Sequence, residues 1–196
     1  ENRGYSDVTI LQPMHKDWNE NVKARCGLEA QPAEEHPQLI VAPEVCGRIR
    51  AISETVKLDR LESELPNLIQ QYRSHLHWGR FDKAMACVEH ASALALAAYG
   101  RELRQMGQTV SAEELSETLR VHIHPHQNRG NLKNRHSELA IQIQSVLARE
   151  NTVGVRSQEE KQELADGWLE LAVSFAKIPV KYEAEKLKQQ QKQEQS

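Results

Sequence analysis

The sequence contains few aromatic residues, few cysteines and no long hydrophobic segment. Phe, Trp and Tyr make up only 5% of its 196 residues, and a chain poor in aromatic residues disfavours extended β-sheets. Cys26, Cys46 and Cys87 show no CxxC spacing, which excludes a disulfide framework and favours a reducing compartment. The longest apolar run, residues 93–99, is far shorter than the roughly 18 residues of a membrane span. We therefore expect a cytoplasmic protein that does not enter a membrane.

The common catalytic motifs are absent as well. The chain has no phosphate-binding glycine loop, no serine elbow and no HExxH helix, each of which positions a specific reactive group. Paired acids do occur, as Glu113 with Glu114 and Glu159 with Glu160. They fall in the expected first turns of helices, where the helix dipole favours carboxylates. We therefore expect the protein to act by binding rather than by catalysis, without a required cofactor.

Helix-forming residues are plentiful. Leu, Ala, Glu and Gln are frequent, and hydrophobic and charged residues account for 39% and 27% of the chain, a balance typical of globular helical proteins. The predicted fold class is all-α, a single helical bundle of about five or six helices with an irregular N-terminal arm. The arm covers residues 1–42 and holds up to two short strands, one of them at residues 39–41. The bundle covers residues 43–186, and the polar, Gln- and Lys-rich tail 187–196 is expected to be disordered.

The spacing of apolar residues places the first helices of the bundle. Pro43 suits the first position of a helix over residues 43–56. A 3-4-3-4 spacing then runs from Leu58 to Tyr72, and Pro66 is expected to kink or break that helix because it lacks an amide donor. Residues 81–106 predict a central helix, since its middle part is apolar on almost every face and must be surrounded by other helices.

Two capping boxes place the later helices. Ser111 with Glu114, and Ser157 with Glu160, have the spacing at which serine and glutamate satisfy each other's backbone amides at a helix start. A further apolar stripe covers residues 132–146. The helix after Ser157 is expected to end at Pro179.

The most informative segment lies between Glu117 and Glu138, where the chain has no acidic residue. The protein has a formal charge of -3, whereas this segment carries +4 before any histidine is protonated. Such local charge reversal indicates a surface that meets phosphate or another polyanion. Lys and Arg would neutralise phosphates, while Asn would hydrogen-bond bases or sugars. The predicted nucleic-acid-binding residues are Arg120, Arg129, Asn131, Lys133, Asn134 and Arg135.

The same segment holds alternating histidines. An extended backbone would place His122, His124 and His126 on one side, where they could bind Zn²⁺. The run His122-Ile-His-Pro125, followed by Asn131-Leu132 and His136, resembles the His-Asn-His nuclease motif. That resemblance implies one histidine as general base and another as a ligand of the catalytic metal. The alternative is that these are ordinary surface histidines.

The tryptophans, the cysteines and the segment 79–91 have simple interpretations. Trp78 and Trp168 are expected in the core, as is Cys87. Cys46 lies beside Arg48 and near the expected start of a helix, a setting that lowers the pKa of a thiol. Residues 79–91 resemble the second helix of a tetratricopeptide repeat, but no second copy follows.

Three functions remain open at this point. The first is a nucleic-acid-associated accessory factor that contacts phosphate through residues 120–136. The second is a protein–protein adaptor that uses the stripe from Leu58 to Tyr72 or the C-terminal helix. The third is a metal-dependent enzyme, nuclease-like, at His122, His124 and His126.

Overall fold

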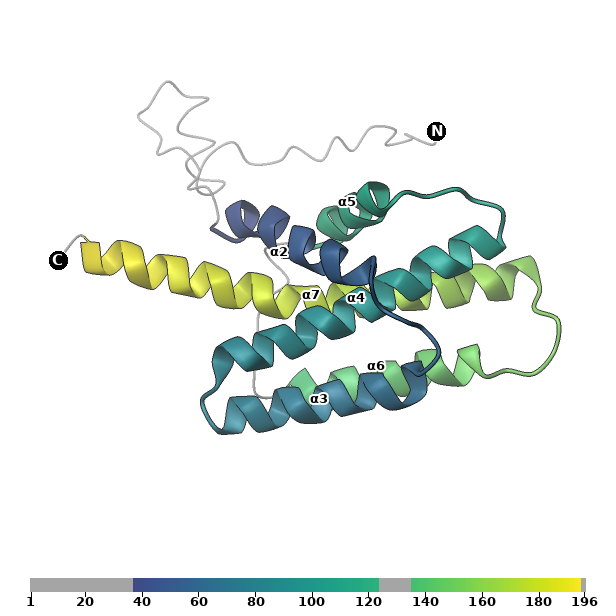
Figure 1. Cartoon of the computed structure of the whole chain (residues 1–196), viewed down its shortest axis with the longest axis horizontal. Helices are drawn as coiled ribbons and strands as arrows, with labels where there is room; N and C mark the ends of the chain where they lie inside the picture. Colours follow the sequence, from purple (N-terminus) through teal and green to yellow (C-terminus); the bar gives the residue numbers. More distant parts are fainter. Residues whose placement is uncertain (1–36, 124–134, 195–196) are drawn as a thin grey trace, which may run out of the picture. The chain divides into compact units, whose positions relative to one another are not determined.

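In a computed structural model of the chain, residues 37–123 and 135–194 are described. Within these ranges the protein has six helices and no β-strand, which confirms the all-α bundle (Figure 1). None of the described helices is long and apolar enough to cross a membrane. The helices are α2 (Pro37–Ser53), α3 (Leu61–His77), α4 (Phe81–Gln105), α5 (Ala112–His122), α6 (Arg135–Glu150) and α7 (Gln158–Glu194).

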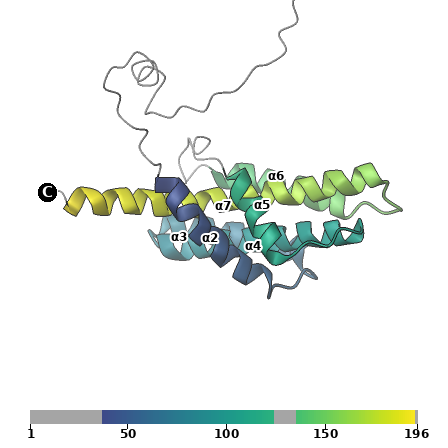
Figure 2. The same cartoon turned by 90° about the horizontal axis from the view of Figure 1, so that it is seen from above.

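The bundle is built around α4 and α7, which pack along each other more extensively than any other pair of helices. They are antiparallel: Phe81 at the start of α4 stacks on Tyr182, while Ser92 further along donates its hydroxyl to the carbonyl of Ala172 at 2.8 Å. Helix α2 lies obliquely across this pair and contacts both (Figure 2). Helix α3 packs on α4, and α6 packs on both α3 and α7.

The core lies between these helices. The apolar middle of α4 is buried on nearly all sides, as its composition predicts. Helix α7 contributes Trp168 and Phe175, and α3 contributes Tyr72, all three fully buried. The stripe that begins at Leu61 and Leu65 is therefore part of the core, since both side chains are buried as well.

Local signals at the helix ends are confirmed. The Ser111 hydroxyl accepts a hydrogen bond from the Glu114 amide, and the Glu114 carboxylate accepts one from the Ser111 amide. The Ser157 and Glu160 pair repeats this pattern, at 3.1 and 2.7 Å. Gly107 follows α4 with a φ of 81°, a conformation that glycine adopts without strain.

Pro43 and Pro179 do not act as predicted, and Pro66 does not break its helix. Helix α2 begins at Pro37 and includes both Pro43 and the segment 39–41 that was predicted as a strand. Pro66 lies inside α3 and Pro179 inside α7, and neither ends its helix. Packing explains the difference, because burial of the flanking apolar residues in the core outweighs one lost backbone hydrogen bond.

The C-terminal tail also differs from the prediction, since α7 continues to Glu194. Ion pairs support the start of this extension. Lys186 Nζ lies 3.7 Å from Glu183 one turn earlier and 3.9 Å from Asp82 of α4. Pairs of this spacing stabilise an exposed helix by a few tenths of a kcal/mol each, about 0.2–0.5.

Candidate functional site

The predicted nucleic-acid-binding residues lie where α5 ends and α6 begins. Arg120 is exposed in the last turn of α5, and its Nε donates to Glu117 at 2.8 Å. Arg135 is the first residue of α6. Arg129, Asn131, Lys133 and Asn134 lie outside the described residues.

The predicted metal ligands are only partly described. His122 is exposed in the last turn of α5, with its Nδ1 2.8 Å from the carbonyl oxygen of Thr118. His124 and His126 lie outside the described residues. Within the described ranges no cluster of three or more His, Cys, Asp or Glu residues could hold a metal ion. The zinc site and the nuclease-like arrangement therefore stay predictions.

Two adjoining hollows lie between α3 and α6, and Arg73 and His136 line both of them. Their cavity volumes are about 200 and 240 Å³. None of the described residues that line either hollow is acidic. The first is lined by Tyr72, Arg73, Leu76, His77 and His136, and the second by Pro66, Ile69, Gln70, Arg73, His136, Ala140, Ile143 and Gln144.

The antiparallel packing of α3 and α6 creates this composition. The end of α6 meets the start of α3, where the Asn151 amide donates to Glu62. The start of α6 therefore lies beside the end of α3. Residues 65–81, in α3 and its C-terminal turn, contain no acidic residue, and the end of this stretch lies beside the start of α6, where the second acid-free stretch of the sequence, 118–137, ends. We call this surface, defined by Arg73, His77 and His136, the α3–α6 surface.

Sequence reasoning missed the contribution of α3. The signal was present, since residues 65–81 hold Arg73 and Arg80 together with two histidines and no carboxylate. A stretch of this length is unremarkable alone. It gains meaning only when the fold places it beside the acid-free stretch at the start of α6.

Trp78 is exposed, contrary to the prediction that it lies in the core. It is the residue that caps the C-terminus of α3, and 70% of it is accessible to solvent. The last buried residue of α3 is Leu76, and the chain then turns through Gly79 with a φ of 66°. Trp78 therefore lies beyond the buried stripe, whereas Trp168 is fully buried, as predicted.

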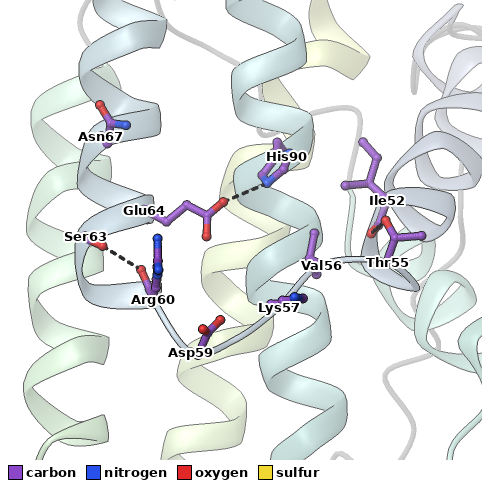
Figure 3. A pocket seen from close by; sticks show the side chains of 10 residues that line it. All are labelled: Ile52, Thr55, Val56, Lys57, Asp59, Arg60, Ser63, Glu64, Asn67 and His90. Carbon is purple, nitrogen blue, oxygen red and sulfur yellow. Dashed lines mark hydrogen bonds and ion pairs between the residues drawn. The ribbon is translucent and has the colours of Figure 1, made fainter.

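A larger hollow of about 860 Å³ lies at the opposite end of α3, where the connection from α2 meets α3 and α4. Charges of both signs line it: Lys57 and Arg60 are accompanied by Asp59 and Glu64. Glu64 and His90 point toward each other across this hollow, with Oε1 and Nε2 3.3 Å apart (Figure 3). We call it the mixed-charge hollow.

In the two described cysteines, Cys46 and Cys87, burial raises the pKa of the thiol. Cys46 is buried in α2, and burial raises the pKa of its thiol to about 11, although the nearby Arg120 acts in the opposite direction. The predicted lowering of that pKa is wrong because α2 begins at Pro37, so that Cys46 lies in the middle of the helix and far from its N-terminal dipole. Cys87 is buried, as predicted, and burial raises its pKa as well. Cys26 lies outside the described residues.

No family model, curated protein or solved structure matches this chain. Its function is therefore inferred from its own residues and their geometry. The two kinds of hollow on α3 differ in the charges of their described lining residues.

Proposed function

We propose that the protein binds nucleic acid through the α3–α6 surface and the basic segment 120–136 that leads into it. One observation carries the proposal: the acid-free stretch 65–81 lies beside the start of α6, where the acid-free stretch 118–137 of the sequence ends, and Arg73 and His136 line both hollows between the two helices. In a chain with a formal charge of -3, such separation of charge supports a surface that attracts a polyanion.

The chemistry of the lining residues fits a phosphate backbone. Arg73 carries a permanent positive charge and a forked set of donors that matches phosphate oxygens. Gln70 and Gln144 add amide groups that can hydrogen-bond sugars or bases. The amides in the first turn of α6 contribute a partial positive charge at the same end of the hollow.

The adaptor hypothesis has less support from the described residues. Its first surface, the stripe from Leu58 to Tyr72, contributes Leu61, Leu65 and Tyr72 to the core. A partner could not reach these side chains without opening the bundle. Only the C-terminal part of α7 remains as a surface for that hypothesis.

The proposal is tested by two charge reversals. One variant combines Arg129→Glu, Lys133→Glu and Arg135→Glu, and the second is Arg73→Glu. We expect both to abolish binding of fluorescent oligonucleotides at low salt while the helical circular dichroism and the melting temperature stay unchanged. For the milder change Arg73→Gln, the slope of log affinity against log salt should fall by roughly 0.7–0.9, the value for one phosphate contact.

Arg60→Glu is the matched control. Arg60 is an exposed arginine that directly precedes the helix carrying Arg73, but it lines the mixed-charge hollow. We expect this variant to bind as the wild type does. Equal affinities of the wild type and both reversal variants, or no binding by the wild type to any single strand or duplex at low salt, would overturn the proposal and leave the adaptor function in first place.

A further inference from the structure

An exposed tryptophan stands beside the acid-free hollows. Indole is among the largest apolar side chains, and most proteins bury it at least in part. Trp78 is nevertheless 70% accessible, although the chain contains only three tryptophans. This exposure leaves a large aromatic face at the surface, where a nucleic-acid base can stack on it.

The position of Trp78 links it to the cationic hollow. His77, the preceding residue, lines the hollow together with Arg73 and His136. The rings of His77 and Trp78 are 5.1 Å apart and meet at 84°. The two rings are therefore perpendicular and not stacked, and the indole has no parallel ring partner in His77.

A second exposed aromatic group nearby is arranged differently. Phe81, at the start of α4, stacks on Tyr182 with ring centroids 6.2 Å apart. Lys186 Nζ lies 5.1 Å from the centroid of that tyrosine ring. These rings already have partners within the protein, which makes Phe81 a useful comparison for Trp78.

We propose that the α3–α6 surface recognises single-stranded nucleic acid, with phosphates at Arg73 and His136 and an unpaired base stacked on Trp78. This inference rests on the proposed function and specifies its ligand. The bases of a duplex are already stacked on one another, so a duplex offers this surface only its phosphates. A single strand offers phosphates and free base faces together, the combination that cationic grooves with aromatic platforms bind.

The test compares three ligands and three variants of the full-length chain. The ligands are a fluorescent single-stranded oligonucleotide, its duplex and heparin, a polyanion without bases. For Trp78→Ala we expect affinity for the single strand to fall roughly 5- to 100-fold, the range for one lost base–aromatic stack, with duplex and heparin binding unchanged. Trp78→Phe should keep most of the affinity, and Phe81→Leu should match the wild type.

Intrinsic fluorescence gives an independent readout. Trp168 is fully buried and should not respond to a ligand, and Trp18 is replaced by Phe in this experiment. The remaining signal from Trp78 should then be quenched by the single strand and not by heparin. Melting temperatures of all variants establish that each one folds, as expected for an exposed position.

The outcomes separate this inference from the proposed function. A wild type that binds no nucleic acid would overturn both. A wild type that binds single strand, duplex and heparin alike, with Trp78→Ala equal to it and no quenching, would overturn the stacking inference and keep the phosphate-binding function. Selective loss of single-strand binding in Trp78→Ala supports both.

Discussion

The hollows at the two ends of α3 differ in the charges of the residues that line them. At its start, Lys57 and Arg60 are balanced by Asp59 and Glu64 in the mixed-charge hollow. At its end, Arg73 and His136 line two hollows without any acidic residue. The larger hollow is thus already neutralised by its own side chains, whereas the smaller ones keep a positive charge. Size alone would select the hollow whose charge balance favours an anionic ligand less.

Two histidines, one in each kind of hollow, have different neighbouring charges. His90, in the mixed-charge hollow, has its Nε2 3.3 Å from a Glu64 carboxylate oxygen. His136 lines hollows in which none of the described lining residues carries a carboxylate. The comparison therefore predicts that charge balance, and not the presence of cations, decides which hollow binds nucleic acid.

The strongest way to break this comparison is to exchange the charge patterns. Gln70→Glu with Gln144→Glu adds two carboxylates to the acid-free hollows at exposed positions. Each new charge close to a phosphate costs about 1 kcal/mol in water, so we expect roughly 30-fold weaker binding to the oligonucleotide. Fluorescence anisotropy measures this effect. Unchanged affinity in the double variant would show that the ligand lies elsewhere.

The reciprocal exchange is the control. Asp59→Asn with Glu64→Gln removes both acids from the mixed-charge hollow and leaves its cations in place. We expect a second, weaker binding site, seen as an additional nucleic acid bound per chain. A variant that gains no affinity would show that Trp78 or the segment 120–136 is needed in addition to exposed cations.

Much of the fold was predictable from local signals. The Ser111 and Ser157 capping boxes act within one helical turn, and they are present as expected. The apolar middle of α4 also identified the central helix. Such features depend on residues only a few positions apart in the sequence, so the chain itself displays them.

What could not be predicted depends on contacts between distant segments. Whether Pro43 begins a helix or Pro179 ends one is decided by the packing of its neighbours, which no local pattern reveals. The acid-free hollows require α3 and α6 to be antiparallel neighbours. The exposure of Trp78 follows from its place one residue outside the final buried turn of α3, a boundary that sequence spacing leaves uncertain.

A second prediction compares how much a nearly buried carboxylate and a more exposed one contribute to the free energy of unfolding. Glu89 is almost buried and accepts three hydrogen-bond contacts from Arg48, the shortest at 2.7 Å. Glu64, in the mixed-charge hollow, is 38% exposed. We expect Glu89→Ala to lower the free energy of unfolding by about 1.5–2 kcal/mol, discounted because Arg48 is itself 44% exposed. Glu64→Ala should cost less than about 1 kcal/mol.

Urea denaturation of the two variants measures this difference directly. Neither residue lines the acid-free hollows, so both variants should bind nucleic acid as the wild type does once folded. If Glu64→Ala were the more destabilising change, the mixed-charge hollow would be part of the structural framework and could not serve as a neutral reference.

A third prediction concerns the dependence of stability on pH. Burial raises the pKa of the Cys46 thiol from its ordinary value of 9.0 to about 11. The folded state therefore favours the protonated thiol, and this contribution to stability is complete below pH 9 and lost as the pH rises through 11. Thiol reagents should leave Cys46 unmodified at neutral pH until the protein unfolds. Rapid labelling of Cys46 in the native protein would show that α2 opens readily.

The smallest expected effect comes from the two histidines, each replaced by alanine. His136→Ala removes one hydrogen-bonding group from the acid-free hollows, a loss of about 0.5–1.5 kcal/mol, so oligonucleotide binding should weaken roughly 2- to 10-fold. His90→Ala should leave that affinity unchanged, because its imidazole faces Glu64 at the other end of α3. Titrations in one buffer measure both, and equal losses in the two variants would mean that binding does not distinguish the hollows. A loss confined to His136→Ala would place the ligand beside α6, where Arg73 from α3 completes the site.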